Sequence, residues 1–366
     1  MQLEPYFATN YASARAKFLA AADACGAQLS AYLHPHAFGA QGEPLAVDVA
    51  RIGGNDARHL LVLSSGVHGL EGRCGSGCQV ALLHDTDLLA QFKRAGVALL
   101  LIHAVNPYGF SHGRRVNEDN IDLNRNFLAH SPAPQDASKS NEYDAVHPLL
   151  LPAEWPPTAD NCAAIAAYVQ SHGERAFQRA VTTGQSSHPD GLFYSGRAPA
   201  WSNQILRQVL HGLAGAGQAL AWIDLHSGLG APGHGEKLYA GRDDPAELAR
   251  ARAWWGADVT SPRAGSSASE EVRGSVASAI YTACPAAQTT SIALEFGTVP
   301  LPTMIDALRA DQWLRSHPDT PAAQRAEIQR QVAAAFYIDT EAWRGALVAQ
   351  TRVAVLQACH GLTALH

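Results

Sequence analysis

Short apolar runs that end in polar, glycine-containing turns constrain the fold of this chain most strongly. Residues 97–103 read Val-Ala-Leu-Leu-Leu-Ile-His and lie between Gly96 and Pro107, and residues 60–63 form a second run. Continuous apolar runs of this length are typical of strands that are buried on both faces of a sheet. Further strands are expected at 45–49, 192–194, 219–225, 237–240 and 291–296.

Helical patterns lie between several of these strands. Helices are expected within 11–34, 79–94, 160–180, 200–214, 244–256 and 321–350. Strands that alternate with helices predict an α/β fold, with a central mixed, largely parallel twisted sheet and helices on both faces. Residues 129–160 are crowded with Pro, Ser, Asp and Asn. Because the α/β pattern resumes after them, we interpret them as a long surface excursion within one domain of residues 1–366.

Composition and charge narrow the classes of partner and compartment. The chain has 366 residues, of which 47% are hydrophobic and 16% are charged, as in globular proteins. An acid stands where a secretory signal would carry bases, and no apolar region follows it, so we expect a cytoplasmic protein. The six cysteines form no CxxC pair and are expected to be reduced. A net charge of -6 without a basic run argues against nucleic acid, and no membrane-spanning stretch is evident.

Two strand ends carry residue types that ligate metals. His68 and Glu71 follow one apolar strand, and His226 follows another. Ligand sites of open α/β sheets lie beyond the carboxyl ends of the strands. A catalytic zinc ion takes three protein ligands and keeps an open position, so these three residues could hold one ion. Asp224 faces the same side of its strand and could orient an imidazole. The alternative is a set of structural or solvated polar residues.

A polar segment after Asn106-Pro-Tyr-Gly109 contains three arginines. An arginine binds a planar carboxylate through two hydrogen bonds, and a neighbouring asparagine adds a donor. Arg125 with Asn124 would therefore suit an anionic end of a substrate. The alternative is that the arginines form structural ion pairs. In that alternative the arginines Arg114, Arg115 and Arg125 would pair with the acids Glu118, Asp119 and Asp122.

One further carboxylate lies in an apolar strand, residues 290–298. Glu295 stands near the end of this run, just before Phe296-Gly297. Burying an unpaired glutamate is costly. Near zinc its carboxylate would serve as a general base that later protonates a leaving amine. A structural glutamate paired with an arginine is the alternative.

Together these motifs resemble the zinc carboxypeptidase superfamily, the M14-like metallopeptidases with their aspartoacylase and succinylglutamate desuccinylase relatives. The resemblance is greatest to the uncharacterised bacterial branch DUF2817. The order is His-x-x-Glu, Asn-Pro-x-Gly, Asp-Leu-Asn-Arg-Asn-Phe, a strand ending in His-Ser-Gly and a strand ending in Glu-Phe-Gly-Thr, over residues 61–298. The resemblance implies a zinc carboxypeptidase-like fold and one Zn²⁺ per chain on His68, Glu71 and His226. It also implies that Glu295 is the general base.

The same resemblance implies a substrate with a free carboxylate, either a small molecule or a peptide. Asn124 and Arg125 would grip that carboxylate. Arg115, with Arg114 as the second choice, would polarise the scissile carbonyl. Tyr239 and Tyr281 are candidates for a tyrosine that closes over the substrate in the peptidases. The implied function is a zinc-dependent hydrolase that cleaves an amide beside a carboxylate-bearing residue, as a carboxypeptidase or an N-acyl amino acid deacylase; an ester substrate stays open.

Two other functions compete with this hypothesis. Gly75-Ser76-Gly77 resembles the nucleophile turn of a serine hydrolase, but Cys74 stands where the G-x-S-x-G motif requires glycine. A catalytically silent binding domain would keep the fold, although it would not need Glu295. The sequence does not fix the oligomeric state.

Overall fold

The computed structural model describes residues 3–54, 57–128 and 142–364. Within them, one sheet has the strand order β1-β2-β4-β3-β5-β7-β6. The strands are β1 (Gln28–Phe38), β2 (Pro44–Ile52), β3 (His59–Ser65), β4 (Val97–His103), β5 (Ala219–Leu229), β6 (Gly235–Tyr239) and β7 (Gln288–Val299). The helices are α1 (Tyr11–Ala24), α2 (Gly72–Leu83), α3 (Thr86–Ala95), α4 (Pro107–His112), α5 (Glu142–Leu150), α6 (Ala159–His172), α7 (Glu174–Thr182), α8 (Trp201–Leu210), α9 (Pro245–Trp255), α10 (Ala279–Ala283), α11 (Leu301–Ser316), α12 (Ala322–Phe336) and α13 (Glu341–Thr363), with short 3-10 helices that include η2 (Gly69–Glu71) and η3 (Leu123–Arg125).

The expected mixed α/β sheet is confirmed, with its parallel part at the centre. The neighbours β4, β3, β5 and β7 are parallel, whereas β1, β2 and β6 join by antiparallel pairing. All seven residues of β4 are buried. Its side chains alternate between the two faces: Leu99 and Leu101 enter one apolar cluster, and Leu100 and Ile102 enter another. This two-sided burial explains why β4 is a continuous apolar run.

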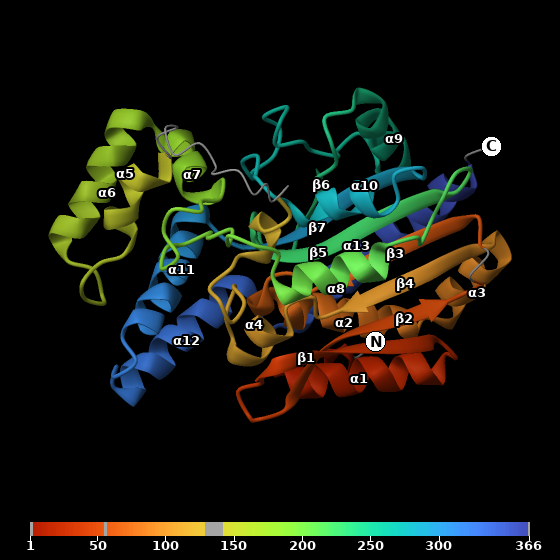
Figure 1. Cartoon of the computed structure of the whole chain (residues 1–366), viewed down its shortest axis with the longest axis horizontal. Coiled ribbons are helices and arrows are strands. Elements are labelled where there is room, and N and C mark those ends of the chain that lie inside the picture. Colours follow the sequence, from red (N-terminus) through yellow and green to blue (C-terminus); the bar gives the residue numbers. More distant parts are fainter. Residues whose placement is uncertain (1–2, 55–56, 129–141, 365–366) are drawn as a thin grey trace.

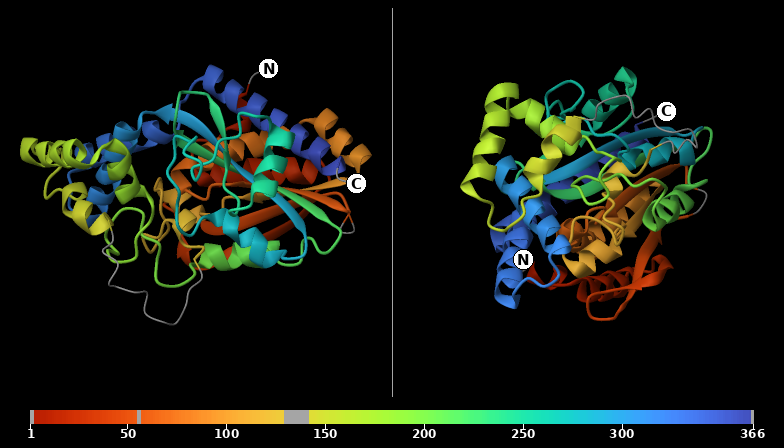
Figure 2. Two further views of the ribbon diagram at one scale, coloured as in Figure 1. Left: turned by 90° about the horizontal axis from the view of Figure 1, so that it is seen from above. Right: turned by 60° about the vertical axis from the view of Figure 1, so that its left-hand side comes forward.

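Helices cover both faces of the sheet, as the left view of Figure 2 shows. On one face, α1, α2, α3, α9 and α13 contribute buried side chains to the same cluster as Leu99. On the other face, α8 and α10 pack against the cluster that contains Leu100. A third apolar cluster joins α5, α7, α11 and α12 (Figure 1). These four helices lie beyond the carboxyl ends of the parallel strands, beside the region where the site residues gather.

Several sequence predictions differ from the structure. The helix expected within 11–34 ends at Ala24, and β1 follows it as an edge strand with mostly exposed residues. The segment 192–194 is not a regular strand and takes part only in an isolated bridge between Gln185 and Tyr194. The region 321–350 is divided between α12 and α13, and α11 was not expected.

The expected surface excursion is only partly visible. Residues 129–141 lie outside the described part of the chain. From Glu142 onward the chain forms α5, whose Tyr143, Val146 and Leu150 are buried in the third apolar cluster. Among the described helices, none has both the length and the apolarity needed to cross a bilayer.

Candidate metal centre and active site

The parallel strands bring the predicted metal ligands to one edge of the sheet. The last paired residues of β3 and β5 are Ser65 and Leu225. His68 lies three residues beyond the end of β3, Glu71 lies in η2, and His226 directly follows Leu225 within β5. One ligand atom from each of these side chains lies within 4.8 Å of the others.

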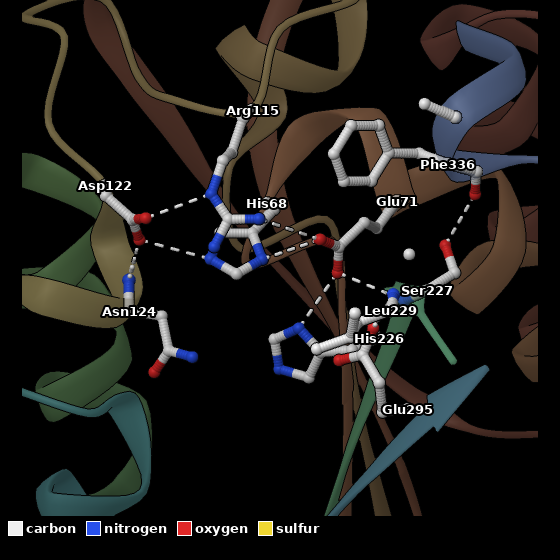
Figure 3. A network of polar contacts seen from close by, with 12 residues as sticks. His68, Glu71, Arg115, Asp122, Asn124, His226, Ser227, Leu229, Glu295 and Phe336 are labelled. Atoms are coloured by element: carbon white, nitrogen blue, oxygen red, sulfur yellow. Dashed lines mark hydrogen bonds and ion pairs between the residues drawn. The ribbon is translucent and has the colours of Figure 1, made fainter. Parts of the chain in front are cut away.

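The two imidazoles face opposite oxygens of one carboxylate (Figure 3). His68 Nδ1 lies 2.8 Å from Glu71 Oε1, and His226 Nδ1 lies 2.9 Å from Glu71 Oε2. The backbone N–H of Ser227 also donates to Glu71 Oε2, at 3.3 Å. All three residues are buried, and each is 3% exposed. Two histidine nitrogens and a carboxylate therefore converge in a place with little competing solvent.

A second carboxylate lies behind each imidazole. His68 Nε2 is 3.1 Å from Asp122 Oδ1, and His226 Nε2 is 2.6 Å from Asp224 Oδ2. Metal-binding histidines commonly donate the N–H of the other ring nitrogen to a carboxylate, which fixes the tautomer and the ring orientation. With both Nε2 atoms engaged in this way, both Nδ1 atoms are left to face the centre. This donor set fits a zinc ion.

The electrostatics of the centre favour positive charge. Burial opposes ionisation of Glu71, but His68 and His226 outweigh it and hold the pKa of Glu71 below its usual range. Burial likewise opposes a charged His226, yet Asp224 and Glu71 raise the pKa of this imidazole well above its usual value. Carboxylates thus stabilise a cation at this centre.

Glu295 lies directly across the sheet ladder from a predicted ligand. In the parallel pairing of β5 with β7, His226 is opposite Glu295. The Leu229 N–H donates to Glu295 Oε1 at 3.2 Å. Burial and the nearby Glu71 carboxylate raise the pKa of Glu295 to about 8. The backbone register thus places a carboxyl group with a high proton affinity beside His226, one of the candidate metal ligands.

The two adjacent arginines point to different places. Arg115 Nη1 donates to Glu71 Oε1 at 3.3 Å and Nε donates to Asp122 Oδ2 at 3.0 Å, and the side chain lines the central cavity. Arg114 instead forms hydrogen bonds of 3.2 Å to both oxygens of Asp311 and does not line that cavity. The structure therefore brings Arg115, and not Arg114, to the predicted site.

Asn124 and Arg125 lie side by side in η3 and both line the cavity. The Val276 N–H donates to Asn124 Oδ1 at 2.9 Å, so the amide NH₂ is the group that remains for a ligand. Arg125 donates to Thr182 O from Nε and Nη2, at 2.9 and 2.6 Å, and to Asn124 O from Nη1, at 3.0 Å. Arginine has five N–H donors. Burial lowers the pKa of Arg125 to about 10, which leaves it cationic at neutral pH.

The alternative for these arginines is a set of purely structural ion pairs. Of the pairs considered, only that of Arg115 with Asp122 is present among the described residues, whereas Arg125 contacts backbone carbonyls. The sequence did not reveal that Asp122 also contacts His68. It also gave no sign of Phe193, whose ring centroid lies 5.2 Å from the guanidinium carbons of Arg115 and Arg125.

The cavity that joins these side chains has a volume of about 360 Å³. Its wall includes both candidate tyrosines. The Tyr239 hydroxyl donates to Arg242 O at 2.8 Å, and the Tyr281 hydroxyl donates to Glu247 Oε1 at 2.6 Å. Both hydroxyls thus hold the cavity wall together, and neither forms a hydrogen bond with His68, Glu71 or His226.

The structure does not favour a serine nucleophile. Ser76 lies inside α2 rather than on a strand-to-helix turn, and it is only 2% exposed. Its Oγ lies 2.9 Å from His103 Nε2, within the core. Burial lowers the pKa of His103 to about 3. A serine hydrolase instead exposes its nucleophile at the top of the sheet.

The sequence matches the family described as Protein of unknown function (DUF2817) over residues 7–350. The chain belongs to the DUF2817 family. This match covers nearly the whole of the chain, including His68, Glu71, His226 and Glu295. A comparison with curated proteins found no match.

Solved structures that are similar to this chain include the following three. Carboxypeptidase A from Helicoverpa armigera is 13% identical, with 89% of this chain and 73% of that chain covered and a TM-score of 0.43. A metallo-carboxypeptidase from Burkholderia cenocepacia is 11% identical, with 94% and 68% covered and a TM-score of 0.43. Bovine thrombin-activatable fibrinolysis inhibitor is 12% identical, with 98% of each chain covered and a TM-score of 0.44.

Proposed function

We propose that this DUF2817 protein is a zinc-dependent hydrolase that cleaves an amide bond adjacent to a carboxylate-bearing residue. The observation that carries the proposal is the convergence of His68 Nδ1, the Glu71 carboxylate and His226 Nδ1, with a further carboxylate behind each imidazole. When bound there, zinc would supply a Lewis acid that polarises a carbonyl and activates water near neutral pH.

Glu295 would move the proton in this reaction. Its carboxylate would accept a proton from the attacking water and pass it to the leaving nitrogen. The raised pKa of Glu295, about 8, reflects burial beside Glu71. A cation bound at the centre would lower this pKa, because an opposite charge favours the ionised carboxylate. Glu295 would then be available as a base at neutral pH.

Three neighbouring residues would bind the substrate. Arg125 and Asn124 would donate hydrogen bonds to its carboxylate, since their side chains line the cavity and Arg125 is cationic. Arg115 would stabilise the negative charge that develops on the scissile carbonyl oxygen. Its contacts with Glu71 and Asp122 hold the guanidinium beside the centre before substrate arrives. Such preorganised charge costs no reorganisation during the reaction.

The substrate assignment is tested by a panel of N-acyl amino acids and short peptides, each offered with a free and with an amidated carboxylate. We expect zinc-dependent release of an amine from the free acids, and little from the amidated forms, because amidation removes the charge that Arg125 would pair with. Saturable binding without hydrolysis in the zinc-loaded protein would instead support a silent binding domain.

Arg115→Ala should lower kcat/KM by on the order of 100- to 1000-fold, the usual cost of removing one stabiliser of an oxyanion. Arg114→Ala is the matched control because Arg114 pairs with Asp311 outside the cavity, so it should lower stability more than turnover. Zinc content measured beside the kinetics separates catalysis from metal loss. Near-normal turnover of Arg115→Ala would contradict the assigned role.

A further inference from the structure

One aromatic ring lies against both of the arginines that would bind the substrate. The guanidinium carbons of Arg115 and Arg125 are each 5.2 Å from the ring centroid of Phe193. Phe193 and both arginines line the central cavity. We propose that Phe193 is a positioning residue whose ring sets the separation of the two guanidinium groups, and that this separation selects substrates by the distance between their scissile carbonyl and their carboxylate. This inference rests on the roles proposed above for Arg115 and Arg125.

The ring lies where two positive charges repel each other. Burial and the positive charge of Arg115 both lower the pKa of Arg125. The face of an aromatic ring attracts cations, and the attraction grows where water is excluded. Phe193 is only 4% exposed. Its ring therefore stabilises two like charges close to each other that would otherwise move apart.

Each arginine is also held by other partners and keeps donors for a ligand. Arg115 donates from Nε to Asp122 and from Nη1 to Glu71 (Figure 3), and its Nη2 has no hydrogen-bond partner within the described part of the chain. Arg125 uses three of its five N–H groups on backbone carbonyl oxygens. These partners differ between the two arginines, whereas the ring is shared by both.

The backbone at Phe193 has an uncommon conformation that its surroundings hold in place. Its φ is 54°, in the left-handed region that non-glycine residues rarely adopt. The Gln185 N–H donates to Phe193 O at 3.1 Å, and the Asp122 N–H donates to Tyr194 O at 2.8 Å. Strain of this kind persists only where the surrounding structure holds it, and it is concentrated at functional sites. The second hydrogen bond also joins the segment of the ring to the segment that carries Arg125.

The separation of the two guanidinium groups would limit the length of the substrate. Arg125 would bind the carboxylate and Arg115 the scissile carbonyl oxygen, so the two groups mark the ends of a fixed span. A compound whose carboxylate lies one carbon nearer to the amide, or one carbon farther from it, would engage both only if an arginine moved. Misplacement of a reacting group by about 1 Å can cost on the order of 100-fold in rate. We therefore expect the protein to discriminate among N-acyl derivatives of α-, β- and γ-amino acids.

The first measurement compares kcat/KM for the N-acetyl derivatives of alanine, β-alanine and 4-aminobutyrate, in which the carboxylate lies progressively farther from the amide. Phe193→Leu should lower the ratio between the preferred compound and the next by about 10-fold or more, because leucine lacks the ring face that holds the guanidinium groups. Phe193→Tyr keeps the ring and should retain the ratio.

The matched control is Phe177→Leu, which makes the same chemical change in the same apolar cluster but outside the cavity lining. It should leave the ratio unchanged, because loss of folded protein lowers kcat/KM for every compound by the same factor. If Phe193→Leu hydrolyses the compounds with an unchanged ratio, the inference about Phe193 is overturned and the hydrolase proposal stands.

The second measurement does not require turnover. In protein that carries ¹⁵N-labelled arginine, the Nε–H resonances of Arg115 and Arg125 are assigned with Arg115→Lys and Arg125→Lys. Both resonances should shift in Phe193→Leu, because the magnetic effect of the ring is lost, and both should stay in place in Phe177→Leu. If the zinc-loaded protein hydrolyses none of the compounds, the hydrolase proposal fails and the resonances alone decide the positioning role. Resonances that do not move in Phe193→Leu would overturn that role in either case.

Discussion

His68→Ala and His226→Ala should each lower the zinc content of the purified protein by one equivalent per chain and abolish zinc-dependent hydrolysis. Each substitution removes one of the three ligands that converge on the centre. Each also leaves the buried Glu71 with one imidazole fewer, and an unpaired buried carboxylate is costly. Metal content is measured by mass spectrometry after growth in zinc.

The control for these variants is His360→Ala, at an exposed position of α13, which should keep both zinc content and turnover. Circular dichroism checks that His68→Ala and His226→Ala remain folded. The contrary outcome is an unaltered protein that folds, comes from cells grown in zinc and still carries no ion at this centre. In that case the cluster of His68, Glu71 and His226 is structural. The hydrolase proposal should then be dropped before any substrate is screened.

Glu295→Gln should lower kcat by about 100- to 10,000-fold while zinc stays bound, because an amide of nearly the same shape cannot accept a proton. The Leu229 N–H, 3.2 Å from Glu295 Oε1, can still donate to the amide oxygen, so the local structure should persist. Single-turnover kinetics measure the effect, and zinc analysis of the same sample shows whether the ion is retained.

Glu236→Gln makes the same chemical change at a neighbouring position. Glu236 lies opposite Glu295 in the antiparallel pairing of β6 with β7, but it does not line the cavity. The turnover of the Glu236→Gln variant should stay near that of the unaltered chain. Comparable losses in both variants would mean that the effect of Glu295→Gln is a general loss of negative charge, and proton transfer by Glu295 would be rejected.

The parallel centre of the sheet could be predicted from the sequence because burial on both faces leaves continuous apolar runs such as β4. The edge could not. β1 buries little apolar surface, so its residues lack the pattern by which a strand is recognised, and the preceding helical pattern was extended into it. Edge strands depend on backbone pairing with one neighbour, and that contact leaves little trace in composition.

The candidate site also has a part that could be predicted from the sequence and a part that could not. His68, Glu71, His226 and Glu295 follow or end apolar strands, so their meeting at one sheet edge could be expected from the sequence. The directions of adjacent side chains could not, and Arg114 and Arg115 are neighbours in sequence that point to different partners. Likewise, the contact of Asp122 with His68 joins residues 54 positions apart. Only the folded chain reveals such contacts.

The pairing of β5 with β7 constrains how this protein can change. Because His226 and Glu295 are opposite each other in the ladder, inserting or deleting one residue within β7 before Glu295 would turn its side chain to the other face. The segment that connects β6 and β7 contributes many residues to the cavity wall, but it does not set the pairing of His226 with Glu295. Engineering of substrate preference should therefore vary that connecting segment and keep the strand lengths constant.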